Sequence, residues 1–255
     1  MSRSAPAPAP FRRAPAAARL LGLLVGLMTP LGATAQSQNE SATYTVTVSG
    51  ITAGRLDLAI TRNGPRYALK SRVASAGLAG LLQPFSVVST AKGRLGNGRL
   101  QPETYASQSD GARAGRGAEI RYDAGVPTVI SAAREEEPDA VPPVDPATQK
   151  GAVDPLTATY ALLQTLPEAQ LCSQSLRIFD GHRASRVTLS GPEMVDGRPT
   201  CAGTYQRVAG YPPRELAKQS TFRFALHYTG LPDGMMQVQE LTLDSPYGLA
   251  RVTRD

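Results

Sequence analysis

The sequence predicts a mainly β, single-domain protein in which an antiparallel barrel-like or spiral sheet surrounds one short central helix. Three observations lead to this fold class. Many short segments alternate apolar and polar residues, and clusters of Gly, Pro, Asn and Asp separate them at near-regular spacing. Only residues 154–166 carry a clear helical pattern.

The first 35 residues have the composition of a secretory signal peptide. Four arginines and no acidic residue precede or flank the apolar run from Leu20 to Met28, and Ala33-Thr34-Ala35 follows. We therefore expect cleavage after Ala35 and a periplasmic protein. The apolar run is too short to span a bilayer, so we expect no transmembrane segment after cleavage; a retained anchor is the less favoured alternative.

Cleavage changes the charge of the chain. Residues 36–255 are long enough for one domain with a substantial core. The signal peptide takes four of the 27 Lys and Arg residues and none of the 21 Asp and Glu residues, which leaves a formal charge of only +2. This small net charge argues against a nucleic-acid partner, because proteins that bind nucleic acids are usually strongly basic.

Period-two alternation marks the strands of the N-terminal half. Strands are expected at residues 44–48, 56–60, 67–69, 85–94, from about 99 to 105, 119–122 and 128–130. Gly96-Asn97-Gly98 is typical of a tight hairpin turn, since both central residues of a type I′ turn need positive φ. Residues 75–82 are expected to form a helical turn or a loop that caps the sheet, and residues 36–42 and 107–117 to form polar loops.

Residues 134–150 form a Pro-rich stretch with an acidic triplet at Glu135–Glu137. We interpret it as a long surface loop within one domain rather than an interdomain linker, because neither half of the chain alone has an obvious closed core. The sequence leaves open whether this loop covers the mouth of the sheet or only connects strands.

The central helix has a well-defined start. Asp154 can cap the N-terminus and Pro155 suits the first helical position. Leu156, Tyr160 and Leu163 fall on one face and should lie in the core. The strands that follow are expected at residues 175–180, 183–190, 203–208, 221–228, 236–243 and 248–253.

The chain has two cysteines, Cys172 and Cys201. Cysteines of exported proteins usually pair, because the compartment is oxidising, so we expect a Cys172–Cys201 disulfide. Redox-active pairs lie closer together, as in Cys-x-x-Cys, so a structural role is favoured.

Few residues suggest chemistry. The two histidines, His182 and His227, do not lie in a pattern of metal ligands, and no motif for a cofactor is present. Asp180 and His182 could act as an acid/base pair, but a tight turn in which Asp180 binds backbone amides is the favoured interpretation. Asp154 and Asp180 could form a carboxylate couple for glycoside cleavage, although the capping role already accounts for Asp154.

Four arginines, at positions 177, 183, 186 and 207, lie on strands near the disulfide region. Alternation would direct some of them to one face, where they could bind an anionic lipid headgroup or a glycan phosphate. A solvated strand face is the commoner explanation. The chain has no Trp and 5% aromatic residues, which argues against stacking on sugars and leaves an apolar interior as an alternative.

Several short motifs, taken together, resemble the DUF3108 family of exported bacterial proteins, most closely its alphaproteobacterial branch. They include Val153-Asp154-Pro155-Leu156-Thr157, Phe179-Asp180-Gly181-x-Arg183 and Cys201-x-x-x-Tyr205-x-Arg207-x-x-Gly210. The Asp-Pro-Leu-Thr and Phe-Asp-Gly-x-Arg motifs, in that order, are the more specific ones. The resemblance spans nearly all of the chain after the signal peptide and implies a β-rich periplasmic protein. It assigns no catalytic residue. We take Asp154, Asp180, Arg183, Tyr205 and Arg207 as candidate binding or structural positions.

The leading hypothesis is a non-enzymatic periplasmic protein that supports the cell envelope and binds a lipid-like ligand or an envelope protein through the concave face of its sheet. The alternative is a periplasmic hydrolase that acts on glycan or lipid through Asp180 and His182. A third hypothesis is a purely structural assembly subunit, which predicts stable oligomers. None of these hypotheses requires a cofactor or a metal.

Overall fold

The computed structural model describes residues 38–96, 98–112, 114–133, 141–245 and 248–255. All of them fall within one compact unit. The signal peptide with its cleavage site after Ala35, the hairpin residue Asn97 and the acidic part of the Pro-rich stretch lie outside the described residues. What the sequence indicates for them stays a prediction.

Strands dominate the described chain, and two groups of them flank the central helix. The first group is β1 (Gln38–Val48), β2 (Ile51–Asn63), β3 (Arg66–Ser75), β4 (Phe85–Gly96), β5 (Arg99–Gly111), β6 (Gly117–Asp123) and β7 (Val126–Ala133). The second group is β8 (Leu166–Pro167), β9 (Ser175–Phe179), β10 (Ala184–Val195), β11 (Arg198–Ala209), β12 (Thr221–Gly230), β13 (Met235–Ser245) and β14 (Gly248–Arg254).

Three short α-helices and two single-turn 3₁₀ helices complete the fold. They are α1 (Gly77–Leu82), η1 (Pro146–Gln149), α2 (Pro155–Leu163), η2 (Glu168–Gln170) and α3 (Pro213–Lys218). The predicted helical turn at residues 75–82 corresponds to α1, and the predicted central helix corresponds to α2.

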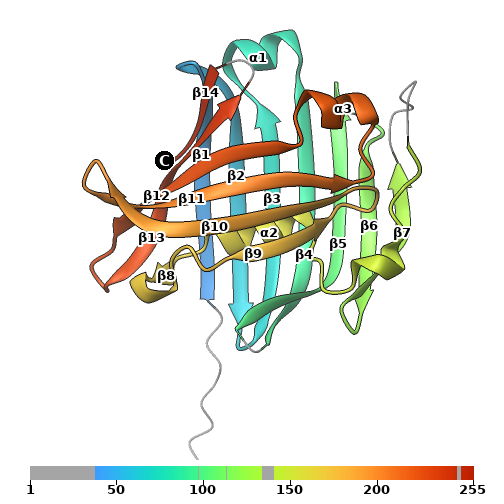
Figure 1. Ribbon diagram of the computed structural model, residues 1–255, viewed down its shortest axis with the longest axis horizontal. Coiled ribbons are helices and arrows are strands. Elements are labelled where there is room, and N and C mark those ends of the chain that lie inside the picture. The colour runs from blue at the N-terminus through green and yellow to red at the C-terminus, as the bar shows by residue number, and fades with distance from the viewer. Residues whose placement is uncertain (1–37, 97, 113, 134–140, 246–247) are drawn as a thin grey trace, which may run out of the picture. The chain divides into compact units, whose positions relative to one another are not determined.

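All strands belong to one 14-stranded sheet with antiparallel pairing. Its order is β7-β6-β5-β4-β3-β2-β1-β14-β13-β12-β11-β10-β9, and the short β8 pairs with β13. Because β1 pairs with β14, the N-terminal and C-terminal meanders join into one surface. The two meanders lie on opposite sides of α2 (Figure 1). The predicted fold class is therefore confirmed.

The sheet does not close by strand pairing, since β7 and β9 are its two ends. The described part of the Pro-rich stretch and the residues 151–153 that follow it bridge these ends. Val144 N donates to His182 O at 2.9 Å beside β9, and Gly151 N donates to Gly125 O at 2.8 Å beside β7. Val153 then forms a parallel bridge with Ile178 of β9. This segment therefore fastens the two ends of the open sheet together.

Helix α2 is the centre of the core, as predicted, but it is shorter than residues 154–166. It ends after Leu163, because Leu166 and Pro167 pair with β13 as β8 instead of continuing the helix. Leu156, Tyr160 and Leu163 are buried, as expected. The buried part of the helix is nevertheless wider than the predicted face, since Thr157, Ala158 and Ala161 are buried as well. A helix enclosed by sheet on several sides needs no polar face.

Two segments expected to be loops are strands. The described residues of 36–42 belong to β1 and pair with β2, and β5 continues to Gly111 where a loop was expected from residue 107. Many positions in these two segments are polar, so the alternation of apolar and polar residues is weak there. Backbone pairing with a long neighbouring strand does not depend on that alternation.

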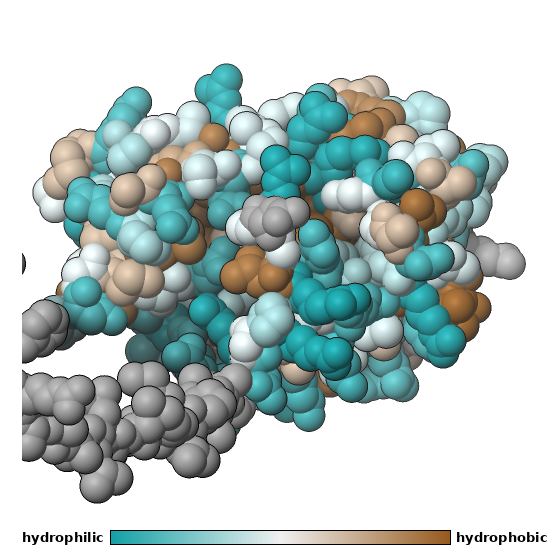
Figure 2. All heavy atoms as spheres, turned by 90° about the horizontal axis from the view of Figure 1, so that it is seen from below, coloured by the Kyte–Doolittle hydropathy of each residue, from teal (hydrophilic) through white to brown (hydrophobic). Residues whose placement is uncertain are grey.

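The described residues contain no helix that is both long enough and apolar enough to span a bilayer. On the face shown in Figure 2, hydrophobic side chains form small, separate patches among hydrophilic ones.

Candidate functional site

Four of the five candidate positions line one cavity. Asp180, Arg183, Tyr205 and Arg207 border a space of about 460 Å³, which we call the inner pocket. The remaining walls are mainly apolar side chains from α2, β10, β12, β13 and the segment after β11. They are Leu162, Val187, Tyr211, Phe222, Phe224, Leu241 and Leu243.

Asp180 fixes the turn that connects β9 to β10. Its carboxylate Oδ1 accepts hydrogen bonds from His182 N at 2.8 Å and from Arg183 N at 2.6 Å. Asp180 N in turn donates to Arg183 O at 3.2 Å. Gly181 has φ +96° and lies close to Ala118, so the turn both needs a glycine and packs against β6. These bonds agree with the turn interpretation of Asp180.

Tyr205 and Arg207 reach the inner pocket because alternate residues of β11 face the same way. The alternation runs from the buried Cys201 through Tyr205 to Arg207, with exposed residues between them. The Tyr205 hydroxyl shares a hydrogen bond of 2.9 Å with the Tyr211 hydroxyl, and the Tyr205 ring lies 6.0 Å from that of Phe222. Strand periodicity thus places the Tyr205 hydroxyl and the Arg207 guanidinium among the apolar side chains of the pocket.

The charged part of the site is formed by Arg183, Arg207, Tyr211 and Glu215, which we call the arginine cluster. Glu215 Oε1 lies 3.4 Å from Arg183 Nη2, and Glu215 Oε2 lies 3.4 Å from Arg207 Nη2. The two guanidinium groups lie over the Tyr211 ring, 4.8 and 5.3 Å from its centroid. One carboxylate therefore faces two positive charges.

Sequence reasoning missed Tyr211, Glu215 and helix α3. The available signal is Pro212-Pro213 followed by Glu215, since proline at the first helical position and an acidic residue in the first turn are typical of a helix start. Six residues are too few to show helical periodicity, which is why the pattern was not found.

Asp154 does not line the inner pocket. Its side chain is fully buried, and its two carboxylate oxygens accept hydrogen bonds from Thr157 N at 2.8 Å and Thr157 Oγ1 at 2.7 Å. Burial raises the pKa of Asp154 from 3.8 to about 6, against the lowering effect of the Thr157 bonds. The predicted capping role is confirmed. Asp154 and Asp180 do not line a common pocket, so the structure does not bring them together as a carboxylate couple.

The predicted disulfide is present between Cys172 and Cys201, with the Cα atoms 5.3 Å apart. Both residues are buried in the core cluster that also contains Leu163 and Leu226. The bond ties the segment after α2 to β11, the strand that carries Tyr205 and Arg207.

The other charged and titratable candidates lie elsewhere. Arg177 binds backbone oxygens of Thr148 and Lys150, and Arg186 is exposed. His227 has both ring nitrogens within 3.1 Å of threonine hydroxyls, and burial lowers its pKa. Within the described ranges, no three His, Cys, Asp or Glu residues gather in a way that could hold a metal ion.

The match to a known family covers most of this site. The profile of the family described as "Protein of unknown function (DUF3108)" matches residues 43–226. The chain belongs to the DUF3108 family. The matched region contains α2, the disulfide, all five candidate positions and the arginine cluster, so the inner pocket of this DUF3108 protein lies largely within the family region.

Comparison with solved structures finds a match of low similarity. A β-barrel-like protein of the DUF1849 domain of unknown function from Brucella abortus has a TM-score of 0.47 and 12% identity, over 85% of this chain and 95% of the other. No curated protein matches the sequence significantly.

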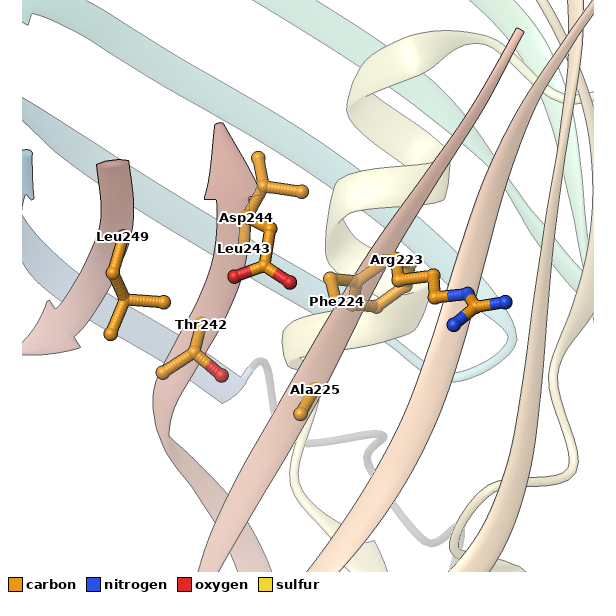
Figure 3. Close-up of a pocket in the computed structure, with 7 residues that line it drawn as sticks. All are labelled: Arg223, Phe224, Ala225, Thr242, Leu243, Asp244 and Leu249. Carbon is orange, nitrogen blue, oxygen red and sulfur yellow. The ribbon is translucent and has the colours of Figure 1, made fainter. Parts of the chain in front are cut away.

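A second, smaller cavity of about 220 Å³ is lined by neighbouring residues of β12, β13 and β14. Figure 3 shows its lining, in which the successive residues Arg223 and Phe224 of β12 point in different directions. Phe224 and Leu243 also border the inner pocket, so the two spaces of this DUF3108 protein share two lining residues.

Proposed function

We propose that this protein is a non-enzymatic periplasmic protein that supports the cell envelope by binding a lipid-like molecule in the inner pocket. The observation that carries the proposal is the combination of an apolar cavity with two arginines at its wall. Its volume of about 460 Å³ lies within the range of roughly 300–1,000 Å³ that is usual for small-ligand sites. The signal-peptide composition of residues 1–35 supports the periplasmic location.

The walls of the pocket suit an apolar chain. Leu162 of α2 faces a space shared with Phe224, Leu241 and Leu243 of β12 and β13. Removing apolar surface from water stabilises a complex by roughly 25 cal/mol per Å². A lipid-like ligand would therefore gain most of its binding free energy from these walls and its orientation from the polar residues.

Filling the inner pocket is expected to abolish binding. The chain has no tryptophan, so Leu241→Trp both fills the pocket and introduces a single fluorescent reporter. We expect the uncharged dye N-phenyl-1-naphthylamine to bind the solvent-extracted wild type, and Leu241→Trp to weaken this binding at least about tenfold, since the apolar contact is lost.

The matched control is Leu95→Trp, at an exposed position outside the pocket lining, which should leave dye binding unchanged. Thermal unfolding checks that both variants are folded. A wild type that fails to bind the dye, or a folded Leu241→Trp that binds it equally well, would contradict the proposal.

The alternative function, hydrolysis through Asp180 and His182, is tested by Asp180→Asn. Asparagine keeps the Oδ1 acceptor for the two backbone amides but loses the charge, so stability in urea should fall by only about 1 to 2 kcal/mol. We expect this variant to complement a deletion strain as well as the wild type. A stable Asp180→Asn protein that fails to complement would instead favour the enzyme.

A further inference from the structure

We infer that Arg183 and Arg207 form a binding site for the negatively charged headgroup of the ligand, and that this headgroup replaces the Glu215 carboxylate between them. The inference rests on the proposed function, because it assumes that the inner pocket binds an amphiphile. It defines the ligand as a single-chain amphiphile with an oxyanion headgroup, either carboxylate or phosphate.

Two partly buried guanidinium groups meet at this site. The side chains of Arg183 and Arg207 are only 17% and 23% exposed, and each lies 3.4 Å from one oxygen of the Glu215 carboxylate. Charge pairs interact more strongly when partly buried than in open water. Arginine also presents planar, paired donors that match the oxygens of a carboxylate or phosphate. The arginine cluster therefore has the chemistry of an oxyanion site.

The contacts of the Glu215 carboxylate with the two arginines are long. Both of its contacts to the arginines measure 3.4 Å, whereas strong charge-assisted hydrogen bonds between such groups are about 2.7–2.9 Å. Glu215 lies on α3, a six-residue helix in which no residue is buried. A ligand oxyanion that approaches both guanidinium groups more closely would compete well against this carboxylate.

Replacement of the Glu215 side chain would not release α3. Arg207 Nη1 donates to the backbone oxygens of Glu215 at 3.1 Å and Gln219 at 3.0 Å, independently of the carboxylate. Arg207 also lies over the Phe222 ring at 5.0 Å. The guanidinium is thus held in position by the backbone and by a ring, and Nη2 remains directed at whichever oxyanion is present.

The same arginines border the apolar pocket, so a head and a tail can be bound together. Arg183 and Arg207 share the lining with Leu241 and Leu243. Asp180, the one acidic residue of that lining, already accepts two backbone hydrogen bonds. The volume of about 460 Å³ is in the lower half of the usual range, which favours one chain rather than two.

The test compares ligands with one tail and different heads. Dodecanoate, dodecyl phosphate, dodecanol and dodecyltrimethylammonium are titrated against the solvent-extracted protein, and displacement of N-phenyl-1-naphthylamine gives each Kd. We expect the better of the two anions to bind roughly tenfold more tightly than dodecanol, and the cation to bind most weakly. Preference for dodecyl phosphate would identify a phosphate headgroup, and preference for dodecanoate a fatty acid.

Two variants separate charge recognition from a structural effect. Glu215→Gln should tighten anion binding about fivefold or more, because the competing charge is removed, and leave dodecanol within about twofold. Arg183→Gln should weaken anion binding about tenfold with dodecanol again unchanged. Glu119→Gln, an exposed carboxylate outside the pocket lining, is the matched control and should change neither.

The inference would be overturned if anions, dodecanol and the cation bound with equal affinity. It would also be overturned if Glu215→Gln bound anions no more tightly than the wild type. Either result would leave the proposed function standing. Failure of every amphiphile and of the dye to bind would overturn both.

Discussion

Replacing both Cys172 and Cys201 by alanine is expected to lower the free energy of unfolding by roughly 3 to 4 kcal/mol. The disulfide joins residues 29 positions apart, and a loop of this length gives that value from the lost entropy of the unfolded chain. Urea unfolding of the oxidised wild type and the double variant, at the same pH, measures the difference.

The reductant supplies the control for this prediction. Wild type in excess dithiothreitol should lose nearly the same stability, whereas the double variant should not respond. A double variant within about 1 kcal/mol of the oxidised wild type would show that the bond between the segment after α2 and β11 contributes little.

The free energy of unfolding is expected to contain a pH-dependent contribution of about 3 kcal/mol from Asp154, and Asp154→Asn should remove it. Burial raises the pKa of Asp154 from 3.8 to about 6 in the folded chain, so the folded state favours the protonated acid. The contribution of Asp154 to stability should therefore be highest below pH 4, fall by about 1.4 kcal/mol per pH unit between pH 4 and 6, and level off above that range.

Asparagine keeps the cap on α2, since its Oδ1 can still accept from Thr157 N and its amide can donate to Thr157 Oγ1. Urea unfolding at pH 4, 5, 6 and 7 compares the variant with the wild type. Asp244→Asn, an exposed position, is the matched control. If the difference in free energy of unfolding between wild type and variant does not change with pH, the assignment of a raised pKa to Asp154 is contradicted.

Much of the fold could be predicted because its determinants are local. Alternation located the strands, the Asp154-Pro155 pair located the start of α2, and the compartment implied by the N-terminal residues accounted for the disulfide. Part of the site followed from the same rule, since alternation along β11 directs both Tyr205 and Arg207 to one face.

The remainder depends on contacts between distant residues. Nothing near Gln38 shows that it pairs with Arg62, and nothing near Glu215 shows that it meets Arg183, 32 residues away. The depth at which Asp154 is buried likewise depends on the sheet that encloses α2. Sequence periodicity identifies which face a residue lies on, but it does not identify the partner opposite that face.

The proposed ligand is tested most directly by native mass spectrometry of residues 36–255, exported to a periplasm and purified without detergent. We expect an added mass that solvent extraction removes, that behaves as a lipid with an anionic headgroup, and that is absent from Leu241→Trp. A wild type that shows only the mass of the disulfide-bonded chain, with no lipid in its organic extract, would contradict ligand binding in the inner pocket and direct attention to a protein partner.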